Sequence, residues 1–560
     1  MKTKDASIQK FKGEASIGPI TGNLTIETPI LKEKSGLLIA ARTTYSDWIL
    51  KSLNNKKLNK SSASFIDLLA KYNHKINKKN SIKITSYYSN DKYQIASDTT
   101  NSYGNNIISL NWHHKFNDKN DANLILAASS YKFNLDYNSK DISKNFNLNY
   151  SIREVNAKLK FKYALSKKHN IKYGVSSKLY NISPGVLQFK DDNSLIENRQ
   201  IDKEKGLENA LFLSNKFIVN KKLSLDIGLR YSQFLTLGKA TQNFYTANSI
   251  IDESSLMVTK KYKENEVIQN YNGLEYRLSA RYLLGDNLSL KASYNKTFQY
   301  IHRLNNNTTA TPIDTWRLSN INISPQEGNQ ISFGLFKNLN DYEFSFETYF
   351  KKYKNILNYK IGANFLLNEN IETEVLQGPG KSYGIEFLIK KKLGKLNGWI
   401  GYNYSRSLLK LDSSFNEEKI NNGNFFPTNY DKPHDFTTVL NYKITKRYSI
   451  STNFIYQTGN PVTYPTGKYK YLDSEYLLYS DRNKFRIPNY YRLDLGINIE
   501  GNHKIKKLAH SFWNISIYNV LGRNNPKSIF FNTNNQGKVL AYKSSIFSYP
   551  IPTITYNFKF

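Results

Sequence analysis

The final ten residues, IPTITYNFKF (Ile551–Phe560), alternate strictly between two kinds of side chain. One set is apolar or aromatic and the other is polar: Pro552, Ile554, Tyr556, Phe558 and Phe560 against Thr553, Thr555, Asn557 and Lys559. Because successive side chains of an extended strand point to opposite faces, this stretch predicts a strand with one apolar and one hydrophilic face.

The same period of two recurs along the chain, for example over residues 223–231, 288–295, 342–351 and 492–499. Short polar or basic turns separate these segments, as at 117–121, 166–169, 220–222, 285–287, 338–341 and 445–447. Long polar connections alternate with the short turns, at 236–269, 301–324, 356–380, 409–432, 458–488 and 522–545. This order predicts an all-β chain of about 22 antiparallel strands, with short turns at one rim and long loops at the other.

Composition and hydropathy limit what kind of protein this is. The chain has 560 residues, a net charge of +34, 42 Tyr, 31 Phe and no Cys, so disulfides, thiolate metal sites and cysteine nucleophiles are excluded. Mean hydropathy is −0.58, and no apolar run approaches the roughly 18–20 residues of a membrane helix. A transmembrane β-barrel gives the same hydropathy, because its signal is alternation.

A membrane barrel assigns each face of the strands an environment. The apolar face meets lipid and the polar face lines the lumen, since only a closed sheet pairs every backbone group in hydrocarbon. A lumen of this size is too wide to be filled by wall side chains alone and implies a plug. The even strand number places both termini at the short-turn rim. The alternative is a soluble all-β protein such as a sandwich array or propeller, but no repeat of about 40 residues is visible.

From about residue 322 onward the chain resembles the C-terminal barrel of the TonB-dependent outer-membrane receptors, in the form common among Bacteroidetes. The matching stretches are SPQEGNQISFGLFKNLNDYEFSFETYFKKYKNILNY (324–359), SYGIEFLIKKKLGKLNGWIGYNYSRS (382–407), NYDKPHDFTTVLNYKITKRYSISTNFIYQTGNPVTYPTGKY (429–469), YYRLDLGINI (490–499) and IYNVLGRNNP (517–526). The opening stretch at 11–50 is similar to the first barrel strands of that family, and the middle matches by layout only.

The resemblance implies energy-coupled uptake of a scarce ligand at the bacterial outer membrane: a siderophore complex, haem, cobalamin, a glycan or a peptide. It implies a plug inside the barrel, pulled by the inner-membrane TonB complex. In this sequence the plug and a signal peptide are expected before Phe11 and are not seen there. We therefore expect a lead-in at 1–10 and a single barrel at 11–560, with the plug supplied by a longer chain or in trans.

No catalytic motif stands out, and neither a cofactor nor a metal site is predicted. The eight His include His113 and His114, which are adjacent and face opposite ways in a strand, and no HExxH, Walker or GxSxG motif occurs. Asp431 and His434 form the resembled Asp-x-x-His motif, for which we expect a structural role at the rim rather than catalysis. The chain is therefore predicted not to be an enzyme.

The long loops carry the candidate ligand contacts. Clustered aromatic rings there can stack on a sugar or a siderophore, or can instead pack within the loop or join the interfacial girdle: Tyr464, Tyr469, Tyr471, Tyr476, Tyr479 and Trp316. The basic residues are spread over turns, lumen faces and loops, so nucleic acid is not an expected partner. Basic outer loops can meet lipopolysaccharide phosphates or anionic ligands. The same charge is also typical of a Lys- and Asn-rich chain translated from an AT-rich genome, which is the favoured reading of the charge itself.

Three functions follow from this reading. The first is a receptor barrel for energy-coupled uptake, the second a passive pore, and the third a surface adhesin that presents long loops. Expected partners are the lipid bilayer, lipopolysaccharide, the barrel-assembly machinery, the plug, the TonB complex and a surface lipoprotein. The resemblance also suggests that the terminal aromatic residue, Phe560, is the signal read by the assembly machinery.

Overall fold

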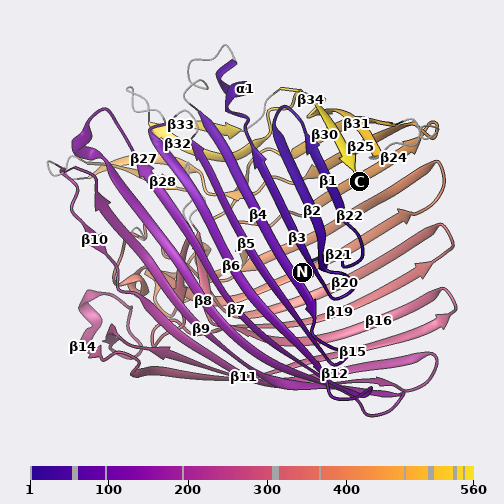
Figure 1. The fold of residues 1–560 in the computed structure, drawn as a ribbon. Helices are drawn as coiled ribbons and strands as arrows, with labels where there is room; N and C mark the ends of the chain where they lie inside the picture. The colour runs from indigo at the N-terminus through magenta and orange to yellow at the C-terminus, as the bar shows by residue number, and fades with distance from the viewer. Residues whose placement is uncertain are drawn as a thin grey trace.

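The computed structural model describes residues 3–52, 61–94, 97–191, 194–305, 314–364, 367–471, 474–501, 510–533, 539–545 and 549–560. Its dominant element is one antiparallel sheet that closes on itself, with inclined strands around a central lumen (Figure 1). The sheet contains 24 strands, of which two are two-residue additions, β10 (Arg199–Gln200) and β23 (Phe426–Pro427). The remaining 22 strands form the predicted barrel.

The barrel strands follow one another around the wall in chain order. They are β1 (Lys12–Ile17), β2 (Thr21–Leu31), β3 (Ser35–Thr44), β4 (Ser62–Lys75), β5 (Asn80–Gln94), β6 (Thr99–Lys115), β7 (Asn120–Tyr137), β8 (Phe146–Ala164), β9 (His169–Phe189), β11 (Glu204–Ile218), β12 (Leu223–Leu237), β15 (Val267–Gly285), β16 (Leu288–Gln299), β19 (Gln326–Asn338), β20 (Tyr342–Tyr359), β21 (Val375–Lys391), β22 (Leu396–Leu409), β24 (His434–Lys443), β25 (Tyr448–Gln457), β30 (Tyr490–Glu500), β31 (His510–Tyr518) and β34 (Ile551–Lys559).

The seam between the first and last strands closes the cylinder. β34 pairs with β31 on one side and with β1 on the other, in a register that places Glu14 opposite Lys559. The Lys559 Nζ lies 2.6 Å from the Glu14 Oε1, and the backbone of Phe560 exchanges two hydrogen bonds of 2.9 Å with Gly13. The stretch IPTITYNFKF is therefore a strand, as its alternation predicts, and it is the strand that closes the cylinder.

The two rims differ as predicted. One rim carries short turns, at 32–34, 76–79, 116–119, 165–168, 219–222, 286–287, 339–341, 392–395 and 444–447, and β1 begins and β34 ends there. The opposite rim carries the long connections. These contain α1 (Asp47–Ser52) and five hairpin pairs: β13 (Ala240–Tyr245) with β14 (Leu256–Tyr262), β17 (Ile301–Asn305) with β18 (Asp314–Leu318), β26 (Pro461–Val462) with β29 (Phe485–Arg486), β27 (Pro465–Tyr471) with β28 (Ser474–Tyr479), and β32 (Pro526–Thr533) with β33 (Val539–Ser545).

The long connections therefore contain more regular structure than the sequence predicts. β20 and β21 also continue their pairing to Tyr359 and Val375, into what the sequence suggests is loop. Apolar side chains there do not alternate with polar ones, because Leu357, Tyr359 and Val375 pack into one buried cluster and Ile356 and Leu376 pack against a second. Short 3-10 turns complete this rim: η2 (Ile142–Lys144), η3 (Glu253–Ser255), η4 (Ile371–Glu374), η5 (Asn416–Glu418) and η6 (Asn421–Gly423). In the part of the chain that the structure describes, no helix is both long and apolar enough to cross a membrane.

Apolar side chains point away from the lumen and stay exposed on the outer wall. Leu211 and Leu213 on β11 are 60% and 53% exposed, and Leu229 on β12 is 49% exposed. The alternate residues face inward and are polar or charged. For example, the Arg230 Nη2 lies 2.5 Å from the Glu208 Oε1, and the Arg230 Nε lies 3.1 Å from the Glu275 Oε1. The polarity of the two faces is thus opposite to that of a soluble barrel.

The residues before β1 run along the inner wall. The buried Lys71 of β4 donates to the carbonyl oxygens of Thr3 and Lys4, at 3.1 and 3.0 Å, and its Nζ lies 2.6 Å from the Asp5 carboxylate. The Ser7 N–H donates to the Glu27 carboxylate of β2 across 2.9 Å. These contacts hold the start of the chain against lumen-facing residues.

The exposure of the outer wall gives a direct test. Leu213→Arg is expected to lower the free energy of unfolding by about 2–4 kcal/mol, because it places a charge on the lipid face. Ser214→Arg, one residue further along and facing the lumen, is the matched control and is expected to have little effect. Urea titrations of the protein folded in lipid vesicles measure both, and equal effects would contradict the assigned faces.

Candidate functional site

The long connections enclose two adjoining cavities at their rim. The first has a volume of about 500 Å³ and the second about 690 Å³. Asn358 and Tyr359 of β20, Asn429 and Val462 line both of them. The walls come from connections far apart in sequence, including β17, the end of β20, and the 410–433 and 458–489 connections. We call the pair the rim cavities.

The first cavity contains a buried histidine. His302 on β17 is 2% exposed, and its Nε2 lies 2.8 Å from the Ser319 hydroxyl oxygen. Burial lowers the pKa of His302 to about 4, since the charged imidazolium is costly to remove from water. The side chain is therefore neutral at pH 7 and is a hydrogen-bonding group rather than a cation.

The second cavity contains a partly buried arginine, Arg482. The Arg482 guanidinium donates to the Asn358 Oδ1 at 3.3 Å and to the Lys360 carbonyl oxygen at 3.1 Å. Among the residues that the structure describes, no acidic side chain contacts it. Burial lowers its pKa to about 10, so the group stays charged at neutral pH. An uncompensated, partly desolvated positive charge favours an anion beside it.

Two of the predicted loop tyrosines lie at this second cavity. Tyr469 of β27 and Tyr479 of β28 line it and are 53% and 47% exposed. The structure thus brings together two of the six aromatic candidates with Arg482. Tyr471 and Tyr476 fall on β27 and β28, but their side chains lie outside the described part of the chain.

The other two aromatic candidates pack against protein. The Tyr464 ring lies edge-on to Phe485 and Phe531, with centroids 5.2 and 5.0 Å away. Trp316 of β18 packs against a buried cluster that includes Phe234 and Tyr300. Their surroundings favour the packing interpretation over ligand contact.

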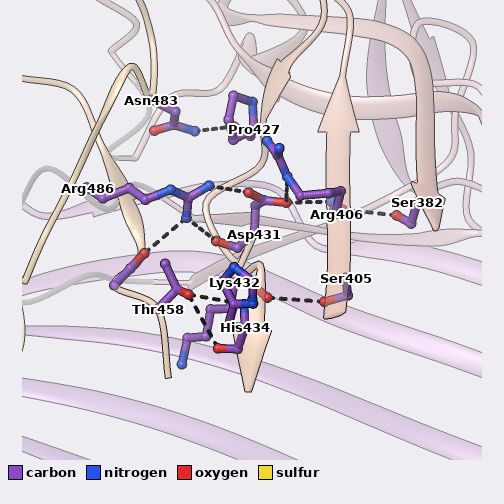
Figure 2. Close-up of polar contacts among 12 residues, drawn as sticks. Ser382, Ser405, Arg406, Pro427, Asp431, Lys432, His434, Thr458, Asn483 and Arg486 are labelled. Atoms are coloured by element: carbon purple, nitrogen blue, oxygen red, sulfur yellow. Dashed lines mark hydrogen bonds and ion pairs between the residues drawn. The ribbon is translucent and has the colours of Figure 1, made fainter. Parts of the chain in front are cut away.

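Asp431 and His434 lie at the same rim with different partners (Figure 2). The Asp431 carboxylate is fully buried and accepts from the Ser407 N–H at 2.6 Å and from the Arg406 Nε at 3.3 Å. It also pairs with Arg486, whose Nη1 donates to the Asp431 carbonyl oxygen at 2.6 Å. The exposed His434 meets the Tyr402 hydroxyl at 2.9 Å instead. The carboxylate thus ties β22 to the 458–489 connection, and the two motif residues do not form a catalytic pair.

The sequence did not indicate His302 or Arg482. His302 lies in a five-residue strand, and Arg482 is a single arginine in a polar loop. Neither position has a local pattern that separates it from other basic loop residues. Among the described residues, no group of three or more His, Asp or Glu is arranged to hold a metal ion.

The family model described as "TonB dependent receptor-like, beta-barrel" matches residues 44–520. The chain belongs to this family, which together with the closed barrel of 22 strands makes it an outer-membrane receptor barrel. Comparison of the sequence with the curated proteins finds no match.

Three solved structures with the same fold are named as receptors or transporters. The siderophore receptor PiuA from Acinetobacter baumannii is 12% identical with a TM-score of 0.68, covering 100% of this chain and 82% of that one. The copper transporter OprC is 10% identical with a TM-score of 0.67, over 100% and 82% of the two chains. The ferric citrate transporter FecA is 12% identical with a TM-score of 0.66, over 100% and 80%. At such identities these likenesses establish the fold.

Removal of the Asp431 carboxylate is expected to destabilise the rim. Asp431→Ala should lower the free energy of unfolding by about 3 kcal/mol, because two arginines and a backbone N–H lose their acceptor. His434→Ala is the control from the same motif and should cost under about 1 kcal/mol, since its side chain is exposed. Urea titration in detergent micelles measures both, and a small effect for Asp431→Ala would count against a structural role.

The buried His302 predicts a pH dependence of stability. The unfolded chain takes up a proton near pH 6.5, whereas the folded protein does so only near pH 4. Stability from this difference is therefore complete above pH 6.5 and is lost as the pH falls towards 4, by on the order of 3 kcal/mol. His302→Gln should flatten this slope in thermal unfolding, while Trp316→Phe on the paired strand should keep it. An unchanged slope in His302→Gln would contradict the assignment.

Proposed function

We propose that this barrel serves energy-coupled uptake of a scarce, anionic nutrient complex through the second rim cavity. The observation that carries the proposal is the Arg482 guanidinium, which is charged, partly desolvated and opposed by no described carboxylate. Tyr469 and Tyr479 provide exposed rings beside it, and amides such as Asn421 and Asn422 provide further hydrogen bonds.

Among the ligand classes that the family resemblance implies, this chemistry favours a ferric siderophore or a related metal chelate. Such complexes present anionic oxygens to an arginine and flat rings to tyrosines. The printed names of the similar structures include a siderophore receptor, a ferric citrate transporter and a copper transporter. Haem, cobalamin, glycans and peptides are the remaining classes. A passive pore and an adhesin are not favoured by these neighbours.

Uptake by the native bacterium tests the proposal. Cells lacking the gene and complemented with it are given radiolabelled iron as a ferric siderophore or as ferric citrate, or a radiolabelled copper salt. Uptake of one of these is expected to need the gene and to stop when the proton-motive force is collapsed. The combined variant Tyr469→Ala, Tyr479→Ala and Arg482→Ala should lower it about tenfold or more.

The matched control replaces the packed ring instead of the cavity residues. Tyr464→Phe should leave uptake near the wild-type level at equal barrel abundance. Uptake that persists after the proton-motive force is collapsed would contradict energy coupling. Energy-coupled uptake that the triple variant leaves unchanged would contradict the assigned cavity alone.

The proposal includes the partners that such uptake needs. We expect a plug inside the lumen, contributed by a longer chain or in trans, with residues 1–10 as lead-in and 11–560 as a single barrel domain. The course of Thr3–Lys10 along the inner wall supports this arrangement. The plug would transmit force from the inner-membrane TonB complex, and a surface lipoprotein is a further expected partner. The Bacteroidetes affiliation stays a prediction from the resemblance.

We also propose that Phe560 is read by the barrel-assembly machinery. Its ring stacks on Phe11 with centroids 5.4 Å apart and is 46% exposed beside the seam. Deletion of Phe560 should lower the fraction of chains that show heat-modifiable mobility on a gel, whereas Phe560→Tyr should not. Equal assembly of the deletion variant would remove this role.

A further inference from the structure

Positively charged side chains without acidic partners line one part of the lumen wall. They lie on β8, β9, β15 and β16, which together with β11 and β12 form six adjacent strands (Figure 1). Within the described ranges, none of them forms an ion pair with a carboxylate. These residues, which we call the lumen arc, are Lys158, Lys160 and Lys162 of β8, Lys172 of β9, Arg277 and Arg281 of β15, and Lys291 of β16.

Alternation along the strands shows that the lumen arc faces inward. On β15, Leu278 is exposed on the outer wall, and Arg277 and Arg281 occupy alternate positions on the other face. On β8, Val155 is 56% exposed on the outer wall, and Lys158 lies three residues further along, on the opposite face. The cations of the lumen arc therefore point into the barrel and not into lipid.

Two cross-strand pairs within the lumen arc bring like charges together. Lys162 of β8 lies directly opposite Lys172 of β9, and Arg281 of β15 lies directly opposite Lys291 of β16. Like charges at directly opposite positions of neighbouring strands destabilise a sheet. A negatively charged partner in the lumen would remove this repulsion.

Inward carboxylates near the lumen arc are mostly paired with other residues. The Glu154 carboxylate lies 3.7 Å from the Lys178 Nζ, and Glu208 and Glu275 both pair with Arg230. The cations of the lumen arc outnumber the remaining carboxylates, so the described chain leaves net positive charge here. Those carboxylates lie nearer the short-turn rim, outside ion-pairing distance of the lumen arc in the described chain: Asp121 and Asp226.

The start of the chain shows how a polypeptide segment neutralises cations of this wall. Lys71 of β4 and Lys83 of β5 face the lumen, and the Nζ of each lies 2.6 Å from the Asp5 carboxylate. Lys4 in turn pairs with Glu27 of β2. The charges of this segment are thus complementary to those of the wall that it crosses. The lumen arc presents the same kind of cation on other strands, without such an acidic segment in the described chain.

We propose that the lumen arc binds an acidic face of the plug polypeptide. The inference rests on the plug that the proposed function requires, and it adds the charge of one plug face and the strands that this face contacts. From β8 to β16 the lumen arc spans about 24 Å around the wall. A surface this wide matches a folded protein face rather than one small anion, because separated cations need carboxylates at matching separations.

Binding of fluorescein-labelled poly-L-glutamate tests the charge of the partner. The barrel in lipid nanodiscs is expected to raise the fluorescence anisotropy of this probe, less so as the salt concentration rises. Lys160→Glu, Lys172→Glu and Arg277→Glu together should weaken binding about tenfold or more. The matched control reverses the same number of inward charges on another part of the wall and should bind like wild type: Lys351→Glu, Lys390→Glu and Lys443→Glu.

Two results of this experiment would overturn the site. Equal weakening in the control variant would show a response to net charge alone. Displacement of the probe by citrate at an equal concentration of carboxylate groups would show that the lumen arc binds small anions. Heat-modifiable mobility checks that both variants are folded. If the arc variant does not fold, Gln replaces Glu at the same three positions and should weaken binding in the same direction.

Entry of vancomycin into the native bacterium tests the plug as the partner. This antibiotic is too bulky for a barrel whose plug is seated, and it enters when the plug is displaced. Cells that carry the arc variant should stop growing at a lower vancomycin concentration than cells with the wild-type chain, and the control variant should not change it. Weakened poly-L-glutamate binding without increased vancomycin entry would overturn the plug as the partner. Neither measurement depends on nutrient uptake, so absent uptake with these results as expected would contradict the proposed function alone.

Discussion

The structure depends on the requirement that backbone polar groups be paired where no water is present. An N–H or C=O left unpaired in hydrocarbon costs several kcal/mol, so a sheet that crosses a membrane must have no free edge. In this chain the first and last strands would be the free edges of the sheet, and the pairing of β34 with β1 removes both edges. The pairing of Glu14 with Lys559 and the backbone exchange between Gly13 and Phe560 complete the cylinder. The first and last strands, more than five hundred residues apart, are therefore mutually dependent.

Closure fixes the environment of every wall residue. Outward side chains such as Leu211 meet lipid and inward ones such as Arg230 meet the lumen. Inward charges accordingly form ion pairs with Glu208 and Glu275 across adjacent strands. The apolar outward surface needs no such pairing.

The wall also supports the rim where the ligand is expected to bind. The long connections place few apolar residues in lipid, so their own hairpins, clusters and ion pairs must order them. The buried Asp431 joins β22 to the 458–489 connection through Arg406 and Arg486. Rigid attachment of this kind holds β27 and β28, with Tyr469 and Tyr479, beside Arg482. A site built from several loops gains its geometry from the barrel beneath them.

The sequence by itself predicts much of this architecture. Strand number, faces and closure follow from three features: the period of two over segments such as 223–231, the alternation of short turns with long connections, and the aromatic end at Phe560. They follow because a membrane leaves one solution to such a pattern. The sequence does not predict the hairpins within the long connections or the longer β20–β21 pair, since their side chains meet water or other loops on both faces. Nothing in the sequence distinguishes Tyr464 from Tyr469 and Tyr479. Only their neighbours in the structure show that Tyr464 packs against other rings, whereas Tyr469 and Tyr479 line a cavity. The uncompensated charge of Arg482 and the neutral state of His302 likewise arise from residues distant in the chain, because burial and partners are properties of the tertiary structure.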